Sequence, residues 1–276
     1  MTSIEILLLV GLLAGVFGAV LGLGGGIIAT PILTIMMGVS IKYAIGASII
    51  AVIATSSGAA VSFLRDRMLN LRVAMFLEIA TTIGAISGAL LSGVVPKGFL
   101  FVLFGALLVF SAVNMIKKLR AKKETKDQVQ ADAISRKLRL DDTYYDKPSQ
   151  RMIHYQVSHV PGGFAMMYGA GIASGLLGIG SGAFKVLAMD TIMGMPIKPS
   201  SATSNLMIGV TASASAMIYF FNGSIRPEIA GPLSIGILIG ALIGSRIMLY
   251  LKARTIRMIF IPVLAYMGLQ MMFRGF

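Results

Sequence analysis

The chain has 276 residues, of which 56% are hydrophobic and only 13% are charged, and its mean hydropathy is +0.86. A water-soluble core cannot hide this much apolar surface, so the composition excludes a soluble globular protein and indicates a multi-pass protein with lipid as its solvent. The chain contains no cysteine, which excludes disulfides, thiol catalysis and cysteine-ligated metals.

The first half of the chain contains four apolar segments, at residues 4–37, 41–64, 73–95 and 99–116. A helix needs about 20 apolar residues to cross a bilayer, and several of these segments reach that length. The first is too long for one straight crossing, because residues 4–38 would form a helix of about 50 Å against a hydrocarbon core of about 30 Å. Glycines interrupt its middle, so we expect two helical arms that meet at a break.

The segment that follows is polar and strongly basic. It holds 11 of the chain's 24 Lys and Arg residues between Lys117 and Arg151. Basic residues concentrate in the cytoplasmic loops of membrane proteins, so we interpret residues 117–160 as a basic cytoplasmic loop on anionic headgroups and not as a nucleic-acid site. Within it, Gln128–Leu140 has the pattern of a short amphipathic helix.

The second half repeats the pattern of the first, with apolar segments at 162–195, again interrupted by glycines, and at 200–221, 229–251 and 256–273. A shift of 156 positions aligns the two halves without a gap. Aligned pairs include Gly15 with Gly171, Gly22 with Gly178, Gly24 with Gly180, Gly26 with Gly182, Ser48 with Ser204, Thr55 with Thr211, Gly84 with Gly240 and Gly88 with Gly244. We therefore expect an all-α membrane bundle of two internal repeats, residues 1–116 and 161–276, each with a glycine-broken helix.

The repeats carry motifs that resemble a known family. Residues 22–33 read GLGGGIIATPIL and precede GVSIKYAIGAS at 38–48, while the second copy has GIGSG at 178–182 and PIKPSSATS at 196–204. This pattern is similar to that of the TauE/SafE sulfite exporter family over nearly everything outside the central loop. The resemblance implies two four-helix repeats and export of sulfite or small organosulfur anions. The long charged loop and Lys185, where many repeats carry an apolar residue, depart from the family pattern.

Two topologies fit the broken segments. If each crosses the membrane once, the repeats are parallel; if each is a hairpin, the repeats are inverted. The inverted arrangement leaves few basic residues outside and puts on the cytoplasmic side, with the central loop, Arg65, Arg67, Arg72, Lys198, Lys252, Arg254 and Arg257. The positive-inside rule therefore favours inverted repeats, whose breaks would approach each other near the midplane, where transporters of this kind bind substrate.

The glycine breaks are the first candidate site. A broken helix in lipid survives only where protein or a water-filled cavity covers its backbone groups. The arm that begins at each break would present free N–H groups and the positive end of a helix dipole, both of which attract an oxyanion. The candidate residues are Gly22, Gly24, Gly25, Gly26, Gly178, Gly180, Ser181 and Gly182. The alternative is that these glycines only let helices pack closely.

Polar side chains within the apolar segments supply further candidates. Lys185 follows the second break, and it either contacts an anion or forms a structural pair with Asp190. Lys198 is expected at the membrane surface. Glu78 and Arg246, isolated charges in their segments, either take part in proton coupling or form pairs. Hydroxyl and amide donors near the breaks complete the substrate-binding set with Ser48, Ser57, Ser204 and Asn205.

The leading hypothesis is a secondary transporter that exports a small sulfur-containing anion, sulfite or an organosulfonate, by alternating access. The alternatives are an anion channel and a membrane scaffold or assembly protein. Without paired carboxylates, a nucleophile motif or an HExxH helix, we do not expect an enzyme, and we expect neither a cofactor nor a metal. We place the protein in the cell inner (cytoplasmic) membrane, with a small anionic substrate and lipid as partners, no nucleic acid, and a homo-oligomer left open.

Overall fold

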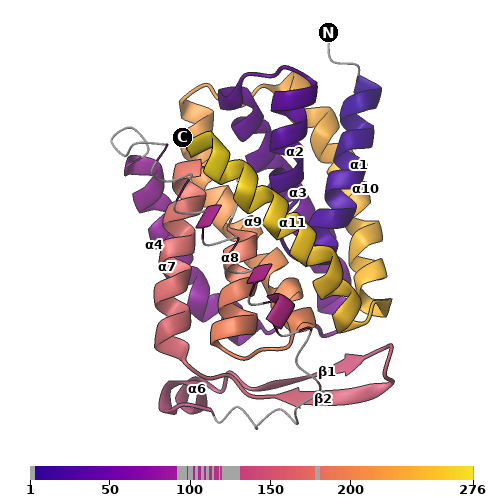
Figure 1. Ribbon diagram of the computed structural model, residues 1–276, viewed down its shortest axis with the longest axis vertical. Helices are drawn as coiled ribbons and strands as arrows, with labels where there is room; N and C mark the ends of the chain where they lie inside the picture. The colour runs from indigo at the N-terminus through magenta and orange to yellow at the C-terminus, as the bar shows by residue number, and fades with distance from the viewer. Residues whose placement is uncertain are drawn as a thin grey trace.

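The computed structural model describes residues 4–91, single positions between 98 and 119, residues 131–177 and residues 181–275. Helices of the first half are α1 (Ile4–Leu21), α2 (Gly26–Pro31), the π-helical turn η1 (Ile32–Met36), α3 (Ile41–Arg65) and α4 (Leu71–Leu91) (Figure 1). They match the first three apolar segments of the sequence. The fourth expected segment, 99–116, falls largely outside the described residues.

The second half repeats this order. It consists of α7 (Val160–Leu177), α8 (Gly182–Leu187), the π-helical turn η2 (Ala188–Ile192), α9 (Ile197–Phe221), α10 (Pro227–Tyr250) and α11 (Ala253–Gly275). Five of the described helices are long and apolar enough to cross a membrane, namely α1, α3, α4, α9 and α10. The prediction of a mostly helical, multi-pass chain is therefore confirmed.

The central segment is not all helix, so the all-α expectation is wrong there. A single helical turn, α6 (Ala133–Leu138), precedes an antiparallel hairpin of β1 (Asp142–Asp146) and β2 (Arg151–Tyr155). The hairpin forms because Tyr144 and Tyr155 point to one face and are buried there, with their ring centroids 6.2 Å apart. The amphipathic helix expected over Gln128–Leu140 is shorter, and residues 128–130 lie outside the described part of the chain.

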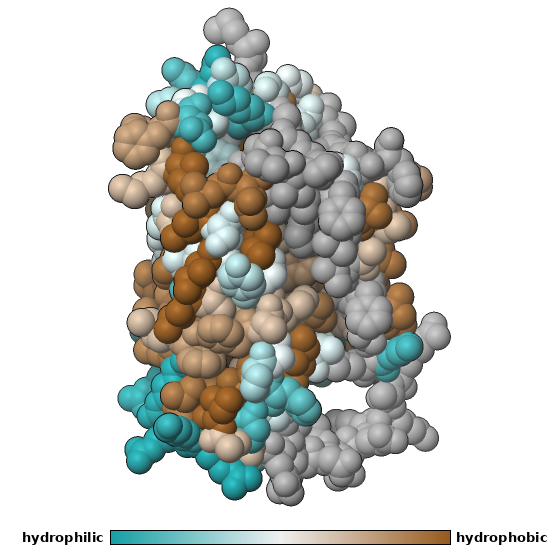
Figure 2. Space-filling model, turned by 90° about the vertical axis from the view of Figure 1, so that its left-hand side faces the viewer, coloured by the Kyte–Doolittle hydropathy of each residue, from teal (hydrophilic) through white to brown (hydrophobic). Residues whose placement is uncertain are grey.

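The outer surface is built for lipid. On α4, Met75, Ile79 and Ile83 recur at every fourth position and are exposed, whereas Leu77 and Thr81 on the opposite face are buried. Figure 2 shows brown apolar residues across the middle of the molecule and teal hydrophilic residues toward its two ends. An apolar belt between two polar ends is the surface that a bilayer requires.

Each broken helix returns toward the end from which it started. In the second half, the backbone N–H of Ser158, just before α7, donates to the carbonyl of Met193, just after η2, at 3.1 Å. In the first half, Leu7 of α1 and Leu33 of η1 belong to one buried apolar cluster. Figure 1 shows that α1 and α7 start at opposite ends of the bundle.

Two glycine-lined interfaces hold the halves together. In the contact of α1 with α10, a Cβ on Gly15 would lie 2.9 Å from the backbone N of Ala241, and in the contact of α7 with α4, a Cβ on Gly171 would lie 3.0 Å from the backbone N of Ala85. Each residue of one contact is 156 positions from its counterpart in the other. These glycines therefore serve close helix packing, the role that small residues have in membrane bundles.

Charged residues gather at the end that carries the hairpin. There, Lys147 is paired with Asp66 just after α3 at 2.8 Å, and its amine lies 5.1 Å from the ring of Tyr250 at the end of α10. At the opposite end, the guanidinium of Arg226 stacks 4.0 Å over the ring of Tyr43. The hairpin therefore docks on the end where α3 and α10 finish and α4, α9 and α11 begin.

Candidate functional site

The first helix break is built by glycine conformations. Gly22 and Gly24 have φ values of +70° and +76°, in the left-handed region that other residues rarely adopt. These two residues let the chain reverse between Leu21, where α1 ends, and Gly26, where α2 begins. In the second break, Gly178 and Gly180 lie outside the described residues, and the description resumes at Ser181.

The two breaks touch each other inside the bundle. A Cβ on Gly182 would lie 2.5 Å from the carbonyl O of Gly22 and 2.6 Å from the Cα of Leu23. The hydroxyl of Ser204 in α9 lies between them, 2.8 Å from the Gly22 carbonyl O and 3.3 Å from the Gly182 carbonyl O. We call Gly22, Gly182 and Ser204 the break junction.

Behind the first break, backbone groups are already satisfied by protein. The N–H of Gly25 donates to Oγ1 of Thr55 at 2.9 Å, and the carbonyl of Gly26 accepts from the hydroxyls of Thr30 at 2.9 Å and Ser48 at 3.4 Å. Ser48 therefore contacts the first break as Ser204 contacts the second. In this conformation the Gly25 N–H is not available to an oxyanion.

Beside the break junction, buried polar atoms lack partners. The hydroxyls of Ser181 and Ser201 and the amide Oδ1 of Asn205 are buried and have no hydrogen-bond partner in the described part of the chain. The Nδ2 of Asn205, in contrast, donates to the carbonyls of Ala19 and Ser201 at 2.9 and 3.1 Å. An unpaired buried polar group costs about 1–3 kcal/mol, so three of them together point to a place for water or a polar ligand.

Lys185 is fully buried and forms an ion pair that the sequence did not reveal. Its Nζ lies 3.2 Å from Oε2 of Glu78 and 2.5 Å from Oγ1 of Thr211, and the Thr211 hydroxyl lies 2.6 Å from Oε1 of Glu78. The suggested partner, Asp190, is instead bound to Arg257 at 2.7 Å. Asp190 follows Lys185 by five residues, too far around the helix to share its face. We call Glu78, Lys185 and Thr211 the charge cluster.

The charge cluster lies at membrane depth. Thr211 is near the middle of α9, a helix of 25 residues, or about 38 Å at ~1.5 Å per residue. Ions are costly there unless they are paired or face a polar cavity. Lys185 also follows the second break within one helical turn. Along α9, Ser204 of the break junction comes first and Thr211 of the charge cluster follows.

Several of the expectations for single residues are wrong or find no support in the structure. Ser57 is exposed on α3, with its hydroxyl bonded to the carbonyl of Ile53 at 2.9 Å, so the structure does not bring it to the other candidates. Lys198 is not at the surface: it is 1% exposed, and its amine binds Asp146 of the hairpin at 2.5 Å. Arg246 is exposed and does not pair with Glu78. The sequence does not single out Ser201, which only its place beside Gly22 of the first break makes notable.

Burial and ion pairing act on the pKa values of the hairpin. Burial alone would raise the pKa of Asp146, but hydrogen bonds from Lys198 and Ser149, with the charge of Lys198, outweigh it and hold the pKa below its ordinary value of 3.8. Burial raises the pKa values of the Tyr144 and Tyr155 phenols, so both stay neutral. The hairpin is thus docked by an ion pair at neutral pH.

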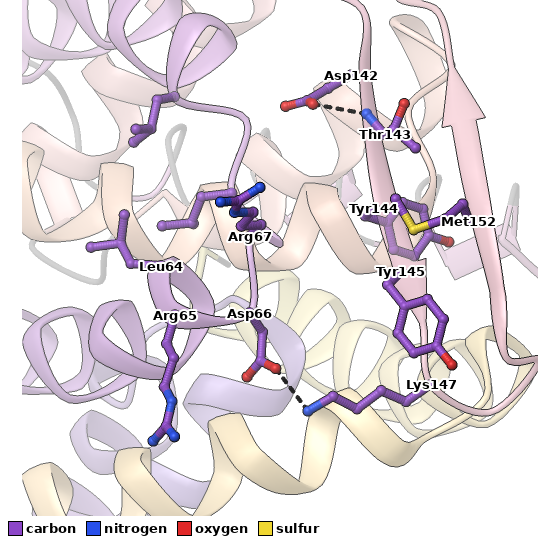
Figure 3. A pocket seen from close by; sticks show the side chains of 12 residues that line it. Leu64, Arg65, Asp66, Arg67, Asp142, Thr143, Tyr144, Tyr145, Lys147 and Met152 are labelled. Atoms are coloured by element: carbon purple, nitrogen blue, oxygen red, sulfur yellow. Dashed lines mark hydrogen bonds and ion pairs between the residues drawn. The ribbon is translucent and has the colours of Figure 1, made fainter.

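A cavity of about 690 Å³ separates the hairpin from the turn that joins α3 to α4 (Figure 3). Arg65 and Arg67 line one side and Tyr145 the other, with the Asp66–Lys147 ion pair at its edge. Lys198, the residue of α9 that binds the hairpin, lies about 20 Å along the helix from Thr211. The cavity is therefore at the polar end of the molecule and distinct from the charge cluster.

The chain matches known proteins along almost its full length. The family model described as "Sulfite exporter TauE/SafE" matches residues 7–271. Curated relatives include the probable membrane transporter proteins YunE and YdhB of Bacillus subtilis (strain 168), 27% and 25% identical, with alignments covering 99% and 89% of this chain and 98% and 89% of theirs. YfcA of Escherichia coli (strain K12), also a probable membrane transporter protein, is 22% identical over 97% of this chain and 89% of its own. No solved structure gives a significant match.

Proposed function

Because the chain belongs to the TauE/SafE sulfite exporter family, we propose that it is a secondary transporter that exports a small sulfur-containing anion, sulfite or an organosulfonate, by alternating access. The family is one of transporters, so the expectation that the chain is not an enzyme is confirmed. The observation that carries the proposal is the meeting of two broken helices beside a buried lysine and three polar groups that have no partner among the described residues.

The anion would bind between the break junction and Lys185. A positive charge at membrane depth attracts an anion strongly, because water and salt screen it far less than a surface charge. The hydroxyls of Ser181 and Ser201 have no hydrogen-bond partner among the described residues. That of Ser181, one turn of helix before Lys185, would donate to a sulfur-bound oxygen. Asn205 contributes an amide on the same helix as Ser201. Gly178 and Gly180 would allow the second break to approach the ligand closely.

Alternating access requires two halves that move against each other, and we propose that residues 1–116 and 161–276 are inverted repeats. Support comes from the opposite starting ends of α1 and α7, and from the glycine contacts that recur with a spacing of 156 residues. The glycine interfaces of α1 with α10 and of α4 with α7 would be the surfaces along which the halves rock.

The end that carries the hairpin would face the cytoplasm. Arg65, Lys147 and Lys252 are at this end, whereas Lys42 and Arg226 are at the other, and basic residues are enriched on the cytoplasmic side of membrane proteins. The docked hairpin and the rest of the basic loop would then lie against the inner leaflet of the cytoplasmic membrane.

The proposal is tested by flux in proteoliposomes that contain the purified protein. Sulfite movement that saturates with concentration and follows its gradient is expected. Conductance that does not saturate would favour an anion channel over a transporter. Inserted protein that moves neither sulfite nor a sulfonate would favour a scaffold. A matched control is Glu228→Gln, which removes an exposed acid at the far end of α10 and should leave flux at the wild-type level.

A further inference from the structure

The charge cluster occurs in only one of two equivalent places in the molecule. The residues 156 positions from Lys185, Glu78 and Thr211 are Ala29, Ser234 and Thr55. The corresponding place, at the first break, is therefore built without any charge, and Thr55 binds the backbone of Gly25 instead. Packing at this position does not need an ion pair, since the same chain packs its counterpart with alanine and serine.

The bonds of the charge cluster constrain what happens when an anion arrives. Lys185 has no carboxylate partner other than Glu78 among the described residues, and the two charges cancel. A monovalent anion that binds Lys185 would bring the local charge to −1 in a region where an uncompensated charge costs several kcal/mol. One proton on Glu78 restores neutrality and removes its competition for the amine.

From this geometry we propose that Glu78 takes up one proton for each monovalent anion that binds Lys185, so that anion and proton cross the membrane together. This inference rests on the proposed function. The proton joins the Glu78 carboxylate from the solution that supplies the anion, and it leaves when the anion departs and Lys185 pairs with Glu78 again. Thr211 contacts both partners, and its hydroxyl bridges Lys185 to either form of Glu78.

Other titratable groups on the elements packed around Glu78 do not replace it. Each lies exposed at the surface or is held by a partner of its own: Tyr168 of α7 is exposed, Tyr219 of α9 donates to the Gly175 carbonyl, Lys198 binds Asp146, and Asp190 binds Arg257. Within α4, Thr82 donates to Oε1 of Glu78 at 3.1 Å and carries no charge. Glu78 is thus the acid beside Lys185 in the described part of the chain.

The first experiment measures sulfite affinity against pH on the purified full chain. Coupled uptake of one proton makes wild-type affinity fall up to about tenfold for each unit of rising pH, because one bound proton is linked to each anion. Glu78→Gln removes the proton site and leaves Lys185 unopposed, so its affinity should be higher and should lose this slope. Sulfite itself also titrates, but its titration affects the wild type and the variants equally. Glu228→Gln, the matched control, should keep the wild-type slope.

The second experiment measures transport. At a pH at which sulfite is present as the monovalent hydrogen sulfite, wild-type flux in proteoliposomes should be driven by a pH gradient. It should not respond to a membrane potential imposed with potassium and valinomycin, because the monovalent anion and the proton together carry no net charge. The double variant Lys185→Ala with Glu78→Ser copies Ala29 and Ser234, the residues of the corresponding place, and should therefore fold. It should lose sulfite binding and flux.

The outcomes separate coupling from transport itself. Saturable wild-type flux that ignores the pH gradient, or a Glu78→Gln slope equal to that of the wild type, would overturn the coupling and leave the transporter. Flux that persists in the folded double variant would also overturn it, because the ion pair would then be dispensable. No wild-type sulfite flux at all would overturn both.

Discussion

Replacement of Gly22 by alanine should separate the two helix breaks. The new Cβ would lie 2.7 Å from the carbonyl O and 2.8 Å from the Cα of Ser201, both backbone atoms that cannot turn away. The same residue holds φ at +70°. Gly22→Ala therefore combines an unfavourable backbone angle with a clash against α9, beside the Ser204 hydroxyl that bridges the break junction.

The size of the effect follows from two costs. A left-handed conformation costs a non-glycine residue about 1–2 kcal/mol, and overpacking a rigid site costs about 1–3 kcal/mol more. The free energy of unfolding should therefore fall by roughly 2–5 kcal/mol. Gly38→Ala is the matched control, because Gly38 has φ of +63° and open space around its Cβ position. It should lose only about 1–2 kcal/mol.

Equilibrium unfolding of the purified variants in mixed micelles measures both values, and proteoliposome flux measures the functional consequence. Gly22→Ala should lose flux, and Gly38→Ala should retain it. Gly24→Ala should fall between them in stability, since its Cβ would meet the mobile side-chain methyls of Val52 and Ile208 at 3.3 and 3.4 Å. Equal losses of stability for Gly22→Ala and Gly38→Ala would refute the close contact at the break junction.

Three other predictions follow from the placement of charges. Lys185→Met should abolish sulfite binding in calorimetry. Lys198→Met should leave sulfite affinity unchanged but expose the hairpin to protease, because Lys198 binds Asp146. Equal losses of affinity in the two variants would contradict this separation. Since the pKa of Asp146 is lowered in the folded protein, its contribution to docking is complete above the ordinary value of 3.8 and is lost as pH falls through the lower folded value. Hydrogen exchange of residues 142–155 in the wild type should therefore rise only below about pH 4. A rise near pH 6 would argue against the ion pair. In this naturally cysteine-free chain, a cysteine at position 254 should react only from the cytoplasm and one at 226 only from outside; labelling of 254 from outside would sink the inverted topology.

Hydropathy and glycine placement predicted the helices well. Lipid requires long apolar segments with internally bonded backbones, so Ile41–Arg65 and Ile197–Phe221 are visible in the sequence within a few residues. The first break was also visible, because Gly22 and Gly24 interrupt a run too long for one crossing. Such features are local, and local sequence specifies them.

Partners across the bundle could not be predicted in the same way. Lys185 and Glu78 are 107 residues apart, and Lys198 and Asp146 are 52 apart, so only the packing of helices brings them together. Spacing along the chain favours Asp190 as the partner of Lys185, but Asp190 pairs with Arg257 instead. Lys198 was expected at the surface because nothing local shows that the hairpin covers it.

The hairpin did leave a signal in the sequence. Tyr144 and Tyr155 are aromatic residues typical of strands, and Pro148 and Ser149 between the strands are typical of a turn. The many basic residues around them, however, favour a loop at the membrane surface over a pair of strands. Asn70 also contributes to docking, with its amide bonded to the Leu140 carbonyl at 2.8 Å and the Tyr155 hydroxyl at 3.2 Å, and no local pattern predicts that contact.

The proposed place of the sulfur-containing anion is beside the break junction at Lys185, and an experimental structure determined with sulfite would show whether it binds there. We expect density for the anion within about 3 Å of the Lys185 amine and of the Ser181 hydroxyl. Anion density confined to the cavity beside Arg65 and Arg67, with Lys185 still paired to Glu78, would contradict it.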